Sequence, residues 1–152
     1  MNALHVVFKV GEAEYVLAAS DVLQMETFSR ATEVPGAASY VAGLVQLRGQ
    51  VIPVVDLRAR FGLPPIARTL DARVLVVRDG DRVVGLLADS AREVINLDTE
   101  TFQKPPGAIG TQSAGFVSAV AQAGTRLVMQ IDFQKVIGQD GIPKERKDGA
   151  ET

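Results

Sequence analysis

The chain has 152 residues, of which 47% are apolar and 5% aromatic, and its formal net charge is −2. This length suits one domain or two closely joined small ones, with a core built mostly from aliphatic side chains. The near-neutral charge and the lack of any basic block argue against a nucleic-acid partner.

Cysteine usage and hydropathy limit the setting of the protein. The sequence contains no cysteine, which excludes disulfides and thiol catalysis and fits a cytoplasmic location. No charged N-terminal segment precedes a long apolar run, so we expect no signal peptide. No apolar stretch reaches the length of a membrane span, so we expect no direct insertion into a membrane.

The first part of the chain is typical of short strands joined by turns. Apolar side chains alternate with other residues, and Gly, Pro, Ser and Asp mark the breaks. Strands are expected, in chain order, over residues 4–10, 15–19, 22–29, 40–47 and 50–55. The last two form a hairpin around Arg48 and Gly49. Pro53 lacks an amide donor, so the second strand of this hairpin is expected at a sheet edge or bulged.

A short helix near residues 56–61 closes this set of strands. Asp56 is a good N-cap, Leu57 and Phe61 are spaced i,i+4, and Gly62 suits the position just after a helix. Together these signals predict about two helical turns.

The second half of the chain resembles the first. The matches are "VFKVGEAEYVLAAS" (7–20) with "LVVRDGDRVVGLLADS" (75–90), "GLVQ" (43–46) with "GFVS" (115–118), and "VDLRARFG" (55–62) with "IDFQKVIG" (131–138). Three matches in the same order favour an internal duplication. They predict two β units of about five strands each, with a second helix near 132–137 that Asp132 caps and Gly138 follows, as Asp56 and Gly62 do for the first. Units of this size are marginal alone, so they should share an interface.

The sequence contains no constellation of residues typical of catalysis, of a metal site or of a cofactor site. His5 is the single histidine, and we expect it at the surface or rim of the fold. One histidine without cysteine argues against a zinc site. The serines lack a His-Asp context and a nucleophile elbow, and the glycines of residues 80–85 belong to a hairpin turn. We therefore expect no enzymatic activity.

Residues 34–63, "VPGAASYVAGLVQLRGQVIPVVDLRARFGL", closely resemble the signature region of the CheW family of adaptor proteins. Residues 83–97 and 125–138 resemble two further blocks of that family. The resemblance implies a mainly β fold of two SH3-like five-stranded β-barrel subdomains with short helices, and cores within and between them. It covers residues 4–139, taken as a single CheW-like domain, and leaves 140–152 as a polar tail that we expect to be disordered.

The resemblance also implies a function. CheW proteins are non-enzymatic adaptors that couple chemoreceptors to a CheA-type histidine kinase. The implied partners are the regulatory domain of the kinase and the cytoplasmic tip of the receptor. Two alternatives stay open: a CheW-like scaffold in another pathway such as pili-driven motility, and, less favoured, a small β-barrel enzyme or ligand carrier.

The resemblance places a receptor-binding surface around Arg48. Gly43 and Gly49 are expected to permit close approach by another backbone. Val22 and Gln24, on the preceding strand, are expected beside Arg48, with Gln24 accepting a hydrogen bond from its guanidinium. The alternative is that Arg48 only occupies a turn and pairs with a nearby acid. The residues that bind the kinase are not identified.

Overall fold

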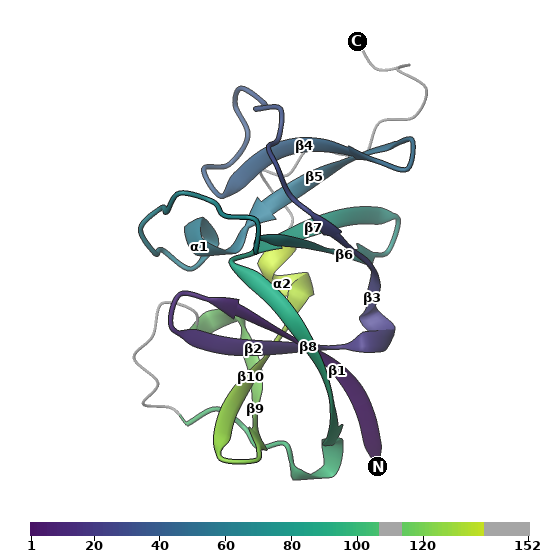
Figure 1. Ribbon diagram of the computed structural model, residues 1–152, viewed down its shortest axis with the longest axis vertical. Helices are drawn as coiled ribbons and strands as arrows, with labels where there is room; N and C mark the ends of the chain where they lie inside the picture. The colour runs from purple at the N-terminus through teal and green to yellow at the C-terminus, as the bar shows by residue number, and fades with distance from the viewer. Residues whose placement is uncertain (107–113, 139–152) are drawn as a thin grey trace.

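The computed structural model describes residues 1–106 and 114–138, and strands dominate them (Figure 1). The expected tail, 140–152, and residue 139 lie outside the described residues. The strands are β1 (Asn2–Val10), β2 (Ala13–Ala18), β3 (Val22–Thr27), β4 (Val41–Leu47), β5 (Gln50–Asp56), β6 (Arg73–Asp79), β7 (Arg82–Ala88), β8 (Ser90–Asp98), β9 (Val117–Ala123) and β10 (Arg126–Ile131). The helices are α1 (Leu57–Arg60) and α2 (Phe133–Ile137), with 3-10 turns η1 (Ala19–Asp21), η2 (Thr99–Thr101) and η3 (Ala114–Phe116).

The strands form two five-stranded sheets. One has the order β8-β1-β2-β10-β9 and the other β3-β6-β7-β5-β4. We call the first barrel A and the second barrel B. Figure 1 shows barrel B above barrel A, with α2 between them. The predicted fold, mainly β with two SH3-like subdomains of five strands, is confirmed.

The two sequence repeats do not coincide with the two barrels. The first repeat supplies β1–β5 and α1, and the second supplies β6–β10 and α2. Barrel A combines the β1–β2 hairpin of the first repeat with β8–β10 of the second, and barrel B combines β6–β7 with β3–β5. The first hairpin of each repeat therefore lies in the barrel formed mainly by the other repeat. Neither barrel is complete without both halves of the chain.

The duplication is visible in matching backbone details. The Asp56 amide donates to the Tyr40 carbonyl at 2.8 Å, and the Asp132 amide donates to the Phe116 carbonyl at the same distance. Asp56 and Asp132 each cap a helix through a carboxylate oxygen, as predicted. The proposed match of 43–46 with 115–118 is wrong, because equivalence of Tyr40 with Phe116 places Gly43 opposite Ala119.

Three buried clusters match the expectation of cores within and between the subdomains. The largest lies between the barrels and includes Phe8, Tyr15, Leu57, Phe61, Leu86 and Ile137. Barrel B is filled by Ile52, Val54, Val74, Val76, Val83 and Leu87, and barrel A by Val7, Val16, Leu97, Ala121 and Val128. Strand β1 contributes to two of these clusters because successive side chains point to opposite faces of the strand, and each face packs in a different cluster.

Two local expectations are wrong. His5 is 1% exposed, because the ring of Phe102 lies 5.4 Å from its own ring and β1 is a central strand, between β2 and β8. Pro53 marks neither an edge nor a bulge, since β5 lies between β4 and β7 and the irregularity in the β4–β5 pairing falls between Val41 and Gly43. Pairing of β5 with β7 runs over residues 54–56, so Pro53 lies just before it and needs no amide there.

Gly43 is expected to be intolerant of any side chain. Its φ is +140°, and a Cβ there would lie 2.2 Å from the Thr32 carbonyl oxygen. The amide of Leu44 donates to that oxygen at 2.8 Å, so the two segments cannot separate without losing the bond. We expect Gly43→Ala to lower the free energy of unfolding by about 3 kcal/mol, measured by urea denaturation.

Gly49→Ala is the matched control for this prediction. Gly49 also has a positive φ, +81°, but a Cβ there would meet nothing within 4 Å. Its cost should be about 1 kcal/mol, from backbone conformation alone. Equal costs at the two positions would show that the close approach at Gly43 carries no energetic weight.

Candidate protein-interaction site

Arg48 occupies the two-residue turn between β4 and β5. Arg48 has φ +52° and Gly49 has φ +81°, and Leu47 pairs with Gln50 across the turn. Positive φ at both central positions is typical of the tight hairpin turns that suit twisted strands. Among the described residues, Arg48 is the only non-glycine with positive φ. A long charged side chain is thus held at a position where glycine or asparagine would be less strained.

The Arg48 side chain projects from the barrel and pairs with an acid. It is 77% exposed, and its Nε lies 3.6 Å from Oε2 of Glu26 on β3. An exposed ion pair of this length contributes about 0–1 kcal/mol, so it orients the guanidinium without holding it firmly. The expected partner was Gln24, which lies two residues earlier on the same face of β3. The alternation of β3 could have identified Glu26, because residues two apart share a face.

The structure brings some of the predicted site residues together and separates others. Arg48 and Gln24 line the same hollow, of about 130 Å³, at one end of barrel B. Gly49 lies beside Arg48 in the turn. Val22 instead packs half-buried against the core between the barrels. At Gly43 the close backbone neighbour is Thr32 of the same chain. The close approach that this glycine permits is therefore internal and does not involve a partner.

The hollow lies at the mouth of barrel B, where the β4–β5 and β6–β7 turns lie on the same side of the molecule (Figure 1). Its apolar lining consists of Leu23, Leu47, Ile52, Val76 and Val83. Its polar lining consists of Gln24, Arg48, Gln50 and Arg78. An apolar floor beneath arginine and amide groups suits binding of a protein side chain and offers no nucleophile with a base.

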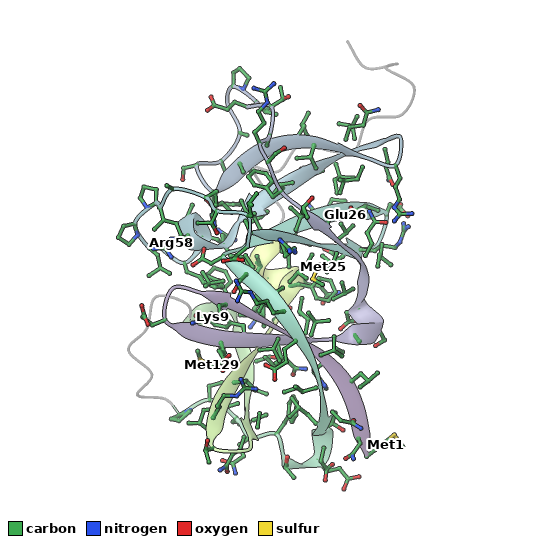
Figure 2. All side chains as sticks on the ribbon, in the orientation of Figure 1. Met1, Lys9, Met25, Glu26, Arg58 and Met129 are labelled. Atoms are coloured by element: carbon green, nitrogen blue, oxygen red, sulfur yellow. The ribbon has the colours of Figure 1, made fainter. Side chains whose placement is uncertain are left out.

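A second group of charges lies where the two barrels meet. Asp89 accepts from Arg58 Nη1 and Arg68 Nη1 at 2.8 Å each, and also from the Gly11 amide at 2.8 Å. Its own amide donates to the Lys9 carbonyl at 2.9 Å. Figure 2 labels Arg58 on barrel B and Lys9 on barrel A, on the same side of the molecule. The hydrogen bonds that the Asp89 carboxylate accepts all come from within the chain. We therefore assign the cluster to holding the barrels together.

The described part of the chain offers little for other chemistry. Within residues 1–106 and 114–138, no group of three or more His, Asp or Glu side chains could hold a metal ion. In the same ranges, no helix is both long and apolar enough to cross a membrane. The exposed features described above, the Arg48 turn and the hollow beside it, lie at one end of a two-barrel β scaffold.

Such a two-barrel scaffold, with its exposed features on turns and barrel ends, defines a class of protein-binding module. The family model described as the CheW-like domain matches residues 4–140, and the chain belongs to the CheW family. Membership in this family makes it a scaffold-type adaptor of chemotaxis signalling.

Individual relatives agree with this assignment. The chain is 30% identical over 135 residues to the chemotaxis protein CheW of Bacillus subtilis, covering 89% of this chain and 86% of that one. It is 28% identical over 145 residues to CheW of Rhizobium meliloti, covering 95% and 90%. The crystal structure of the scaffolding protein TtCheW from Thermoanaerobacter tengcongensis superposes with a TM-score of 0.83 at 29% identity, covering 93% and 96% of the two chains.

One relative that is not named as a chemotaxis protein matches a smaller part of this chain. Protein PilI of Pseudomonas aeruginosa is 31% identical over 103 residues, which is 65% of this chain and 57% of that protein. The chemotaxis relatives therefore cover considerably more of the chain than this one does.

Proposed function

We propose that the protein links the cytoplasmic tip of a chemoreceptor to the regulatory domain of a CheA-type histidine kinase, without catalysing a reaction itself. Residues 4–139 would act as one adaptor domain in the cytoplasm, where both partners are available. The observation that carries the proposal is Arg48, an exposed guanidinium in a strained turn of a CheW-family fold. The wider coverage of the chemotaxis relatives favours this pathway over pili-driven motility.

Arg48 is proposed as a receptor contact, with Gly49 shaping its turn and Gln24 beside it at the barrel mouth. The weak pairing with Glu26 leaves the guanidinium available to a partner carboxylate or carbonyl. Val22 and Gly43 would support this surface indirectly, Val22 by packing β3 on the core and Gly43 by seating β4 against Thr32.

Replacing Arg48 is expected to weaken receptor binding while preserving the fold. A charged hydrogen bond contributes about 1.5–3 kcal/mol, so Arg48→Ala should weaken binding of a receptor tip fragment by about 10- to 100-fold. Binding of the kinase regulatory domain should stay within about twofold. Both affinities are measured by calorimetric titration beside a melting curve.

Arg48→Gly separates the contact from the turn. Glycine removes the side chain but suits the positive φ of this position, so it should melt at or above the wild-type temperature while binding receptor as weakly as Arg48→Ala. Unchanged receptor affinity in both variants would refute the contact. Unfolding of both variants would mean that Arg48 serves only the structure.

A further inference from the structure

The mouth of barrel B has a second arginine that the family resemblance did not identify. Arg78 lies on β6 directly across from Val83 on β7, and Val76, two residues earlier, lies across from Gln24 on β3. Paired residues, and residues two apart on one strand, share a face of the sheet. Arg78 and Gln24 therefore stand on the same face as Val76 and Val83, which are 3% and 4% exposed and close the floor of the hollow.

The charges around this hollow are not balanced by the chain itself. Among the described residues, Arg78 takes part in no ion pair, and the neighbouring Asp79 is paired with Arg82 at 3.3 Å. Arg48, which also lines the hollow, has one long contact with Glu26. Two guanidinium groups thus line the hollow, and among the described residues only Arg48 has an acidic partner. Both lie over apolar side chains, where an added carboxylate would be less hydrated and more strongly attracted than in open solvent.

The size of the hollow limits what it can take. Its volume of about 130 Å³ is several times the roughly 30 Å³ of one water molecule, enough for one branched aliphatic side chain but not for a cofactor. Leu23 extends the apolar lining outward, since it is 52% exposed at the rim. An aliphatic group could therefore enter while its polar neighbour remains at the rim with the arginines.

We infer that the mouth of barrel B binds a receptor segment in which a carboxylate side chain stands next to an aliphatic one, with Arg78 as the anchoring cation. The aliphatic side chain enters the hollow over Val76 and Val83, and the carboxylate lies between Arg78 and Arg48. This inference rests on the proposed receptor-binding function and adds to it the chemistry of the bound segment and a further specificity-determining residue.

The test is titration of Arg78 variants with the same receptor tip fragment, at low and at moderate salt. Arg78→Glu should weaken binding at least tenfold, and the loss should shrink as salt rises, because a screened charge repels less. Arg78→Lys keeps the charge and should stay within about threefold of wild type. Leu23→Ser should weaken binding severalfold with little salt dependence, since it removes an apolar contact.

Arg30→Glu is the matched control. Arg30 is exposed and lines a different hollow on barrel B, to which neither Arg78 nor Arg48 contributes, so Arg30→Glu makes the same change in net charge outside the proposed subsite. Wild-type affinity for Arg78→Glu, or an equal loss for Arg30→Glu, would overturn the inference. If Arg48→Ala still weakened binding in that case, the proposed function would stand without this subsite. If wild-type protein bound no receptor fragment, the proposed function and the subsite would both fail.

Discussion

A chain cut between its two repeats is expected to stay folded as a noncovalent complex of its halves. The β1–β2 hairpin of the first half lies between β8 and β10 of the second, and β6–β7 lies between β3 and β5. The two pieces are thus joined by four strand pairings and by the core between the barrels. The connection from α1 to β6 contains Leu70, which is 94% exposed, so a protease site inserted after Leu70 should be cleaved readily.

After cleavage, both fragments should elute together in size-exclusion chromatography and separate only in denaturant. Unfolding becomes bimolecular, so the melting temperature of the cut protein should rise with protein concentration. Each half produced alone should lack stable β structure by circular dichroism, because each barrel would miss two or three of its five strands. Halves that separate in native buffer and fold independently would contradict the exchanged arrangement.

Removal of the Asp89 carboxylate is expected to be the most damaging change to a charge. Asp89 is 18% exposed and joins Arg58 and Arg68, which are 11% and 18% exposed, to the Gly11 amide. Arg68 also contacts Asp56 at 2.7 Å, so the loss would extend to the cap of α1. Breaking a buried pair costs roughly 3–5 kcal/mol, and this partly exposed cluster should be near the lower end.

We therefore expect Asp89→Ala to lower the free energy of unfolding by about 3 kcal/mol in urea denaturation. Asp81→Ala is the control, since Asp81 is exposed in the β6–β7 turn and forms no ion pair with any described residue; its cost should be below about 0.5 kcal/mol. If Asp89→Ala cost no more than Asp81→Ala, the cluster would not hold the barrels together.

Local signals predicted the elements of the fold well, because each acts over a few residues. The Asp56 and Asp132 caps, the glycines after each helix and the Arg48–Gly49 turn all lie where the sequence placed them. The exchange of hairpins could not be predicted this way. The same strands and turns fit a fold in which each repeat forms its own barrel, and the choice between the two depends on contacts distant in sequence.

The same limit explains the errors at single residues. Nothing near His5 in the sequence shows that Phe102 packs against its ring, so a lone histidine near a terminus is expected at the surface. The pairing of Arg48 with Glu26 could be predicted from the sequence, since Glu26 lies two residues after Gln24 and therefore on the same face of the strand. Arg78 could not be predicted in the same way. In the sequence it is an ordinary polar residue of a strand, and only the folded barrel brings it to the same hollow as Arg48.

The most direct test of the adaptor function is co-sedimentation of a CheA-type kinase with membranes that carry the chemoreceptor. The kinase is expected to sediment with these membranes only when the protein is present. Arg48→Gly should leave the protein bound to the kinase but return both to the supernatant. Sedimentation of the kinase to the same extent without the protein, or with Arg48→Gly in place of wild type, would contradict a coupling function that acts through Arg48.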